Sequence, residues 1–516
     1  MTRKKLPIGI QTFSKIREEN YYYVDKTPLI ERLVNGGTHY FLSRPRRFGK
    51  SLFLDTLAEA FSGNKSLFEG LYLERNWDWN KKYPVIRISF AEGRLFDAAG
   101  LNNHIHVELD ANASRLGSIL PGRSEDVHVR FRALIETAAQ KYNQRAVVLV
   151  DEYDKPILDN LTEPEIARSM REGLCNFYSV LKGQDANLKF VFLTGVSKFS
   201  KVSIFSGLNN LMDITLLSEY ATICGYTDND INTVFAPELE GLDRDEIRRW
   251  YNGYSWLGER VYNPFDVLLL FNAREFRSWW FETGTPTFLV NWLKERNFFT
   301  PSLEHTFADD ELLSAFDVDY IRPEAMLWQT GYLTIGERQR RGAKYIYWLR
   351  CPNCEVRSAL NDVLVKAWMP DAGEVARAGA ELYEIIAGRD IDGMRRHFER
   401  LFASIPHDWY RNNSIAQYEG YYASVFYSHL AALGLDIIAE DVSNHGQCDL
   451  AVRFENRIYL FEFKVIDGEE PTGEALQQLL SRDYAAKYRD DKTEIVQIGI
   501  EFSQSKRQVV EWRVAT

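Results

Sequence analysis

Residues 41–51 read Phe-Leu-Ser-Arg-Pro-Arg-Arg-Phe-Gly-Lys-Ser and stand between a short apolar run and a helical pattern. The ending Gly49-Lys50-Ser51 matches the end of the phosphate-loop pattern G-x-x-x-x-G-K-[ST]. In such a loop the glycine lets backbone N–H groups approach the phosphates, the lysine reaches the β- and γ-phosphates, and the serine hydroxyl binds Mg²⁺. Arg44 replaces the first glycine, which predicts a loop of different curvature in which Arg44, Arg46 or Arg47 adds charge to the phosphate site. The expected nucleotide-binding residues of the loop are Arg44, Pro45, Arg46, Arg47, Phe48, Gly49, Lys50 and Ser51, the last of them also a metal ligand.

An acidic pair follows a second apolar run. Ala146–Val150 is apolar throughout, and Asp151 and Glu152 come directly after it. Both acids are therefore expected at the carboxyl end of a buried strand, where open α/β sheets bind their ligands. Asp151 is the predicted Mg²⁺ ligand of the nucleotide site, and Glu152 is the predicted catalytic residue that polarises the attacking water. Thr194 is expected either to sense the γ-phosphate or simply to end a strand, and Asp154 is expected to be a local cap.

The first half of the chain alternates β-rich runs with helical stretches. Near-continuous apolar runs are typical of strands that are buried on both faces of a parallel sheet. The runs are His39–Ser43, Val85–Phe90, Ala146–Val150 and Phe190–Thr194. We therefore predict an α/β fold in which residues 1–225 form a P-loop domain with a parallel-sheet core.

The middle of the chain changes in pattern. Residues 226–330 are mostly helical in pattern and rich in Trp and Tyr, which is typical of a helical lid. The runs Gly331–Ile335 and Tyr345–Leu349 predict a hairpin, so residues 226–370 are expected to combine the lid with a winged-helix-like element. The hairpin turn carries Arg338, Arg340, Arg341 and Lys344. It is expected to be solvated, with contact to phosphate as the alternative.

The last part of the chain predicts a second α/β domain. Residues 371–404 are expected to form a helical connector, and residues 405–516 a compact domain of their own. The expected elements of that domain are a helix from Ile415 to Leu433, strands over Cys448–Phe454 and Ile458–Val465, a helix over Glu474–Tyr488 and a final strand over Glu494–Phe502.

Two ionisable residues interrupt an apolar strand of this domain. Glu462 and Lys464 are two residues apart and share one face of the strand. Burying them without partners would cost several kcal/mol, which implies a metal, a substrate or a counter-charge. A hairpin is expected to bring Asp449 beside Glu462, and Glu419 is a third acid on an otherwise apolar helix stripe.

These acids predict a metal site for phosphodiester hydrolysis. Asp449, Glu462 and Glu419 are the expected ligands of Mg²⁺, with Mn²⁺ as a possible substitute, and Lys464 is expected to position the water or stabilise the transition state. Asp449, Glu462 and Lys464 are thus the predicted catalytic residues. Gln478 and Tyr484 are expected either to face the same cleft or to pack. The alternative is a buried Glu462–Lys464 ion pair with Asp449 in a turn.

Composition limits the classes of function. The chain of 516 residues has 62 Lys and Arg against 73 Asp and Glu, a formal charge of −11, which argues against a protein that coats nucleic acid through bulk charge. It does not exclude an enzyme that holds nucleic acid locally. Five cysteines and the lack of a signal-like start favour a reducing cytoplasm, and no stretch approaches the roughly 20 apolar residues of a membrane span. A cytoplasmic protein without membrane contact is expected.

Taken together, these residues resemble a prokaryotic family in which an AAA-ATPase-like domain is joined to a C-terminal PD-(D/E)XK nuclease-like domain. The resembling segments before the nuclease-like domain are Tyr23-Val-Asp-Lys-Thr27, Arg44-Pro-Arg-Arg-Phe-Gly-Lys-Ser51, Asp151-Glu-Tyr-Asp-Lys-Pro156, Thr194-Gly-Val-Ser-Lys-Phe199, Phe205-Ser-Gly-Leu-Asn209, Tyr251-Asn-Gly-Tyr254, Thr283-Gly-Thr-Pro286 and Pro352-Asn353. Those of the nuclease-like domain are Glu419, Gly446-Gln-Cys-Asp449, Glu462-Phe-Lys464, Gln478 and Tyr484. The family usually has Gly-Arg before the aspartate, where this chain has Gln447-Cys448.

The resemblance implies an AAA-type ATPase core, a restriction-endonuclease-like domain and the cofactors ATP and Mg²⁺. The expected activity is ATP binding and hydrolysis that controls a metal-dependent nuclease, and analogy suggests defence against foreign DNA. The alternative is a regulatory switch or scaffold that binds nucleic acid or a protein without cleaving. The expected partner is nucleic acid, DNA in preference to RNA, together with further copies of the chain, since a neighbouring subunit could supply an arginine finger.

Overall fold

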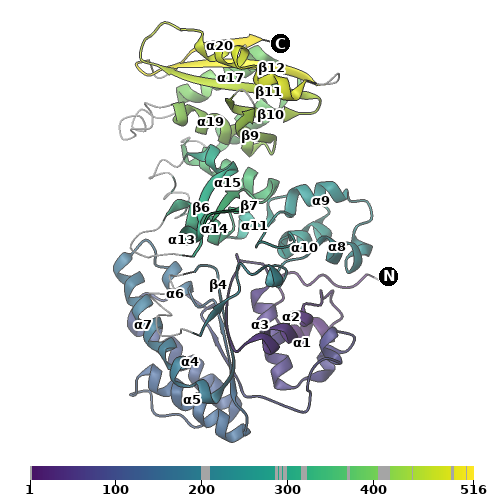
Figure 1. Ribbon diagram of the computed structural model, residues 1–516, viewed down its shortest axis with the longest axis vertical. Helices are drawn as coiled ribbons and strands as arrows, with labels where there is room; N and C mark the ends of the chain where they lie inside the picture. The colour runs from purple at the N-terminus through teal and green to yellow at the C-terminus, as the bar shows by residue number, and fades with distance from the viewer. Residues whose placement is uncertain are drawn as a thin grey trace. The chain divides into compact units, whose positions relative to one another are not determined.

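The computed structural model describes residues 3–198, 210–284, 289, 293, 299–314, 322–368, 372–404, 419–443, 446–489, 493–506 and 508–515. The chain forms two compact units. The first unit consists of Met1–Trp280 and Ala308–Tyr347, and the second of Phe281–Phe307 and Trp348–Thr516. Each unit contains a five-stranded sheet of its own (Figure 1).

The sheet of the first unit is parallel and has the order β2-β3-β4-β1-β5. Its strands are β1 (His39–Ser43), β2 (Val85–Ser89), β3 (Ala146–Asp151), β4 (Leu188–Gly195) and β5 (Met212–Asp213). Strands β1 and β3 are buried along their whole length, as expected from their continuous apolar runs. One strand, β4, separates β1 from β3, so the phosphate loop and the acidic pair lie at the same sheet edge with Thr194 between them.

Helices cover both faces of this sheet. They are α1 (Phe13–Glu18), α2 (Thr27–Gly36), α3 (Lys50–Ser62), α4 (Ala98–Leu116), α5 (Val127–Tyr142), α6 (Lys155–Leu158) and α7 (Pro164–Gly183), with short 3₁₀ turns between them. Figure 1 shows α1, α2 and α3 on one side of the strands and α4, α5 and α7 on the other. This layering buries both faces of the sheet and confirms the predicted parallel core.

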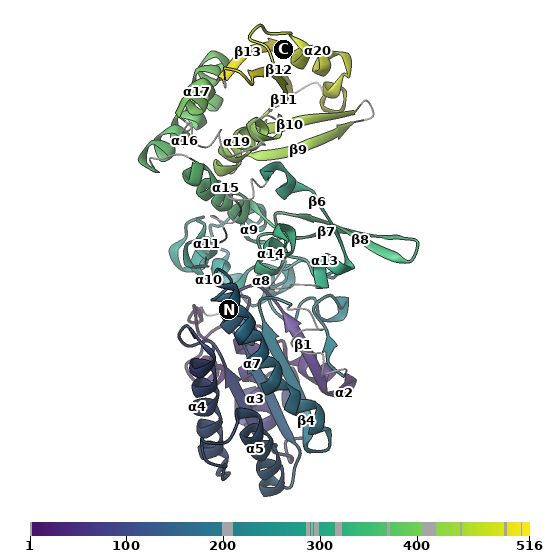
Figure 2. The same ribbon diagram turned by 90° about the vertical axis from the view of Figure 1, so that its left-hand side faces the viewer.

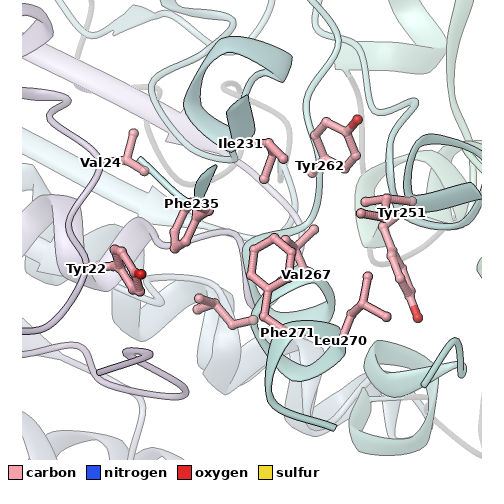
Figure 3. Packing of buried hydrophobic residues seen from close by; sticks show 11 residues of the cluster. Tyr22, Val24, Ile231, Phe235, Tyr251, Tyr262, Val267, Leu270 and Phe271 are labelled. Atoms are coloured by element: carbon pink, nitrogen blue, oxygen red, sulfur yellow. The ribbon is translucent and has the colours of Figure 1, made fainter. Parts of the chain in front are cut away.

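A small helical layer belongs to the same unit. It consists of α8 (Asp228–Thr233), α9 (Arg244–Tyr251) and α10 (Pro264–Ala273). Its core includes two side chains from near the N-terminus, Tyr22 and Val24, which pack with Phe235 and Phe271 (Figure 3). The tilted rings of Tyr22 and Phe235 lie 5.1 Å apart. The N-terminal segment therefore ties the lid helices to the sheet domain.

The winged-helix-like element follows the lid. It contains β6 (Thr306–Asp309), α13 (Asp310–Ser314), α14 (Pro323–Thr330), β7 (Thr334–Arg341) and β8 (Lys344–Arg350), after α11 (Trp279–Gly284). The three strands form a sheet in the order β6-β8-β7. Strands β7 and β8 are the hairpin that the sequence predicts, and they are longer than expected at the turn.

The second unit has a mixed sheet in the order β13-β12-β11-β10-β9. Its strands are β9 (Asp436–Ser443), β10 (Gly446–Phe454), β11 (Arg457–Ile466), β12 (Glu494–Ser503) and β13 (Gln508–Ala515). Only the β11–β12 pair of this sheet is parallel. The helices are α15 (Cys354–Trp368), α16 (Ala372–Ala387), α17 (Ile391–Ser404), α19 (Glu419–Ala432) and α20 (Glu474–Ser481), with 3₁₀ turns at Thr300–Glu304 and Tyr484–Tyr488.

Two expectations for this unit were wrong. The helix predicted over Glu474–Tyr488 ends at Ser481, because Asp483 adopts a left-handed conformation (φ 46°) and a separate 3₁₀ turn follows. The strand predicted as the last one is followed by β13, which forms the sheet edge. The predicted helix from Ile415 begins at Glu419 in the structure, and residues 415–418 lie outside the described ranges.

Candidate functional site

The phosphate loop joins β1 to α3. Gly49 has φ 94°, a conformation that glycine adopts without strain, and α3 begins at the next residue. The Lys50 ammonium donates hydrogen bonds to the carbonyl oxygens of Arg44 (2.9 Å) and Pro45 (3.0 Å), so its side chain lies across the loop. Burial lowers the pKa of Lys50, and the nearby Asp151 and Glu152 carboxylates oppose that shift. The lysine and the acidic pair therefore belong to one electrostatic site.

The acidic pair is linked to the neighbouring strand. The Thr194 hydroxyl donates to Asp151 Oδ1 at 2.7 Å and so fixes that carboxylate from β4. Glu152 has φ 50°, and its N–H donates to Asp151 Oδ1 at 3.1 Å. Burial raises the pKa of Glu152, although Lys50 acts in the opposite direction. A carboxylate with a raised pKa is a better proton acceptor, as a residue that polarises water must be.

Asp154, next to this site, stabilises the backbone at the end of β4. Its buried carboxylate accepts hydrogen bonds from the backbone N–H groups of Val196 (3.0 Å) and Ser197 (2.6 Å) and from the Ser197 hydroxyl (2.5 Å). Burial raises the pKa of Asp154, and these hydrogen bonds counteract the shift. Asp154 thus holds the end of β4, which is the capping role that the sequence favours.

The Arg44 side chain lies in the interior of the domain. It is fully buried (0% exposed), and the guanidinium donates to the carbonyl oxygens of Ser43 (2.9 Å), Thr215 (3.0 Å) and Tyr220 (3.1 Å). It also lies over the Trp256 ring, 4.1 Å from the centroid. Burial lowers the pKa of Arg44 to about 10. The expectation that its side chain adds charge to the phosphate site does not fit this placement, whereas Arg46 and Arg47 are exposed.

Aromatic residues hold the loop from the lid side. The Phe48 ring packs edge-on against Tyr254 (4.7 Å) and Trp256 (5.4 Å). The Trp280 indole N–H donates to the carbonyl oxygen of Arg46 at 3.2 Å. Gly331 has φ 94°, and a Cβ there would lie 2.7 Å from Pro45. No local sequence pattern connects these residues to the loop, because they lie more than 200 positions further along the chain.

The second candidate site lies on β10 and β11. Glu462 is 1% exposed, and Lys464 Nζ lies 3.7 Å from Glu462 Oε1. Asp449 Oδ2 accepts a hydrogen bond from the backbone N–H of Phe463 at 2.8 Å. The structure thus brings Asp449, Glu462 and Lys464 to one place, as the alternation of the strands predicts.

Gln478 and Tyr484 lie beside these residues. The Gln478 side-chain amide donates to Glu462 Oε1. Tyr484 is buried next to Cys448, and a Cβ added at Gly446 would lie 3.1 Å from the Tyr484 hydroxyl. Burial raises the pKa of the Cys448 thiol, so the residue that replaces the family's usual arginine is a neutral packing group.

The donor set suits a hard divalent cation. Asp449 and Glu462 offer carboxylate oxygens, the ligands that Mg²⁺ and Mn²⁺ prefer. Glu419 is the first residue of α19, but its side chain lies outside the described residues. Within the described part of the chain, no three His, Cys, Asp or Glu side chains form a group that could hold a metal ion. The two acids on the sheet therefore need Glu419, water or substrate oxygens to complete a coordination shell.

Sequence reasoning missed Glu501, although the rule that found Glu462 would have found it. Glu501 interrupts the apolar strand β12, pairs in register with Lys464 and is fully buried. Its carboxylate accepts hydrogen bonds from the Thr472 N–H (2.6 Å) and hydroxyl (2.9 Å) and from the Ala475 N–H (3.3 Å). Burial raises the pKa of Glu501, but these hydrogen bonds outweigh it and the net shift is downward. Glu501 thus fixes the start of α20, the helix that carries Gln478.

Comparison with known proteins finds a family model for each of the two regions that contain these candidate sites. A family model described as predicted AAA-ATPase matches residues 7–205, and a model of the PD-(D/E)XK nuclease superfamily matches residues 417–512. The chain belongs to the predicted AAA-ATPase family with a PD-(D/E)XK nuclease domain. Members with these domains generally use a nucleotide and a divalent metal ion.

A protein of Azotobacter chroococcum mcd 1, described as an uncharacterized protein in the vnfD 5′ region, is 58% identical over 511 residues, which cover 99% of this chain and 98% of that relative. No solved structure matches the chain. Within the described residues, no helix has the length and apolar character needed to cross a membrane. Of the segments that resemble the family, residues 199, 205–209 and 285–286 lie outside the described ranges.

Proposed function

We propose that this family member binds and hydrolyses ATP and thereby controls a Mg²⁺-dependent nuclease that cleaves phosphodiester bonds of nucleic acid. The observation that supports the proposal is that two separate clusters of charged residues occur on one chain, each of a kind suited to one of these reactions. The first cluster is Lys50 with the Thr194-linked Asp151, and the second is Asp449 with Glu462 and Lys464. A protein that had lost either activity would be free to lose Lys50, Asp151 and Glu462, because each of these buried charges costs free energy to bury.

The residues of the first site can perform the steps of ATP hydrolysis. Lys50 can exchange its two loop carbonyls for the β- and γ-phosphate oxygens, and Ser51 and Asp151 would hold the Mg²⁺. Glu152, with its raised pKa, would accept a proton from the attacking water. Thr194 keeps Asp151 in one orientation through its hydrogen bond.

The residues of the second site can support phosphodiester hydrolysis. A bound Mg²⁺ supplies a water of lowered pKa and neutralises charge on the phosphate. Asp449 and Glu462 would hold the ion, and Gln478 orients the Glu462 carboxylate from α20. Lys464 keeps its ammonium beside Glu462, from where it can donate to the water or to a phosphate oxygen.

Cleavage assays test this proposal. The full chain is incubated with plasmid DNA or RNA and Mg²⁺ or Mn²⁺, with and without ATP. We expect cleavage by the wild type and a loss of at least about 100-fold in Asp449→Asn and Lys464→Gln, since each lacks a group that acts on the transition state. Glu469→Gln, an exposed acid of the same unit, is the matched control and should cleave normally. Equal cleavage by all four proteins would rule out this site as the nuclease.

The rival function is a nucleotide-dependent switch that binds nucleic acid or a protein without cleaving it. Cys448 favours it, because this neutral buried thiol stands where the family usually has an arginine. In that case the wild type would bind ATP, Lys50→Ala would not, and no metal would produce cleavage products.

A further inference from the structure

The hairpin of the winged-helix-like element exposes a continuous basic segment. All nine residues from Glu337 to Tyr345 are exposed, whereas Tyr332–Ile335 at its base are buried. Figure 2 shows the β7–β8 hairpin extending beyond α13 and α14. The segment carries four cations and one acid, in a chain whose formal charge is −11. We call Glu337–Tyr345 the basic hairpin tip.

Three cations of the basic hairpin tip, Arg338, Arg340 and Lys344, make no ion pair within the described residues, although Arg340 Nε donates to the carbonyl oxygen of Gly342 at 3.2 Å. The one acid of the tip, Glu337, accepts a hydrogen bond from the Gln339 amide at 2.7 Å. Arg338 lies over the Tyr345 ring at 4.8 Å, which holds its guanidinium on one face of the hairpin. Arg338, Arg340 and Lys344 therefore present positive charge on an ordered β-ribbon.

The helix that precedes the hairpin, α14, packs inside the first unit and is not free to bind nucleic acid. Residues Ala325–Gln329 of α14 are buried, and Gln329 Oε1 accepts a hydrogen bond from the Lys198 N–H at 2.9 Å. Gly331, directly after the helix, packs against Pro45 of the phosphate loop. A helix buried in this way cannot enter a DNA groove to read bases. Contact with nucleic acid at this element would thus be made by the hairpin and would involve the phosphates.

We propose that the basic hairpin tip binds the phosphate backbone of duplex nucleic acid without reading its sequence. A two-stranded ribbon has the width of a duplex groove, and arginine is suited to phosphate. A single strand would call for a series of stacking aromatic rings, and the tip has only Tyr345. An anionic membrane would call for apolar side chains at the turn, which reads Arg341-Gly-Ala-Lys344. The choice of nucleic acid as partner rests on the proposed function.

Binding measurements on the full chain test the proposal. The protein carries Asp449→Asn and is kept in EDTA, so that binding is observed without cleavage. The probe is a fluorescein-labelled DNA duplex of mixed sequence, and its anisotropy is followed over a series of KCl concentrations. The hairpin variant combines Arg338→Gln, Arg340→Gln and Lys344→Gln. The control variant combines Lys65→Gln, Arg75→Gln and Lys82→Gln, three exposed cations elsewhere in the same unit, and removes the same charge.

The expected result is specific to the hairpin. Each lost phosphate contact reduces the slope of log K against log salt by about 0.9, so the hairpin variant should show a slope shallower by about 2 to 3 and an affinity at least about tenfold weaker. The control variant should bind like the unsubstituted protein. An unchanged thermal unfolding midpoint in both variants shows that the fold is intact.

Other results overturn the proposal. Equal losses in the two variants would mean that bulk charge is responsible, and no loss would mean that the tip does not touch DNA. Loss of binding to vesicles of anionic phospholipid, with DNA binding unchanged, would assign the tip to a membrane. Failure of the proposed function is distinguishable: hairpin-dependent binding without any cleavage by the Asp449-intact protein would refute the nuclease and support this inference. Normal cleavage by the Asp449-intact protein with the same three hairpin substitutions, together with unchanged DNA binding by the hairpin variant, would refute this inference and support the nuclease.

Discussion

Arg44 stands where a glycine would otherwise begin the phosphate loop, and its side chain turns into the protein. The guanidinium donates hydrogen bonds to the backbone carbonyl oxygens of Ser43, Thr215 and Tyr220. It also lies over the Trp256 ring. The loop therefore owes its shape to a buried cation as well as to Gly49. A residue at this position can be essential for nucleotide binding and yet contribute nothing to the charge that a phosphate meets.

Replacing Arg44 should mainly lower the free energy of unfolding, because its side chain is buried inside the domain. Arg44→Met removes the hydrogen bonds to three buried carbonyl groups, and we expect a loss of about 2 to 4 kcal/mol in the free energy of unfolding, measured by urea denaturation. Arg46→Met changes an exposed residue of the same loop and should cost no more than about 0.5 kcal/mol. An Arg44→Met protein as stable as wild type but unable to bind ATP would contradict this account.

Thr194 should affect the rate of ATP hydrolysis more than the affinity. Thr194→Val keeps the shape of the side chain and removes its hydrogen bond to Asp151, a bond to a charged group worth about 1.5 to 3 kcal/mol. We expect kcat to fall about 10- to 100-fold with KM nearly unchanged, measured by phosphate release. Thr194→Ser should restore the rate, and a KM effect without a kcat effect would refute the assignment.

The residues of the two sites differ in how far the sequence predicts them. Glu462 stands out because strand alternation makes a charge on an apolar run costly, and the same physics applies to Glu501. The role of Arg44 could not be predicted, because two of its carbonyl partners, Thr215 and Tyr220, are 171 and 176 residues away. Local sequence patterns thus identify charged residues in apolar strands. The role of each charged residue depends on contacts with residues that are distant in the sequence.

At the scale of elements, a pair of histidines joins α17 to α19. The Nε2 atoms of His397 and His429 lie 2.9 Å apart, and both rings are buried. Burial lowers the pKa of His397 to about 4 and, with the neighbouring ring, that of His429 to about 3. Glu381 and Arg400 face His397 with opposite charges. Both rings are therefore neutral at neutral pH, and one donates to the other.

This pair should make stability depend on pH. Because the folded-state pKa values lie below the ordinary value of about 6.5, the unfolded chain binds more protons between about pH 3 and 6.5, and stability is lost as pH falls through that window. The slope is at most about 1.4 kcal/mol per pH unit for each histidine. We expect His397→Gln/His429→Gln to flatten the dependence of urea stability on pH, while the exposed control His305→Gln leaves it unchanged. An identical slope in the double variant would contradict the pKa shifts.

The strands show why some elements are predictable from sequence. The four runs of the first sheet were recognisable because strands buried on both faces are apolar throughout. Strand β13 was missed because it lies at a sheet edge and reads Gln-Val-Val-Glu-Trp-Arg-Val-Ala, with no buried run. The break at Asp483 was missed because helical periodicity continues through it, and only the backbone conformation ends the helix.

At the scale of the whole molecule, two sheets carry the two candidate sites. Each sheet has its own core and its own set of charged residues, so we expect that each proposed activity can be removed alone. If nucleotide binding controls cleavage, the signal must nonetheless begin at the phosphate loop, which Trp280 and Gly331 contact within the first unit.

Two substitutions separate these activities. Asp449→Asn should abolish cleavage and leave ATP hydrolysis at the wild-type rate, because the ATPase residues lie in the other unit. Lys50→Ala should weaken ATP binding at least about tenfold, through loss of a charged contact to phosphate, and should make cleavage insensitive to added ATP. Parallel assays of both reactions on both variants check this. Cleavage by Lys50→Ala that still responds to ATP would show that control does not pass through this loop.

The path of the chain between the units has a practical consequence. The polypeptide crosses from one unit to the other at three points, and Phe281–Phe307 belongs to the nuclease unit although it precedes the hairpin. There Thr300 donates to the Ser424 carbonyl at 3.1 Å, and Glu304 pairs with Arg357 at 2.9 Å. A fragment that begins after Tyr347 would lose both contacts and leave the partly buried Arg357 without its carboxylate partner. Any recombination that joins the second unit to a different ATPase-like domain must therefore transfer two separate segments of the coding sequence.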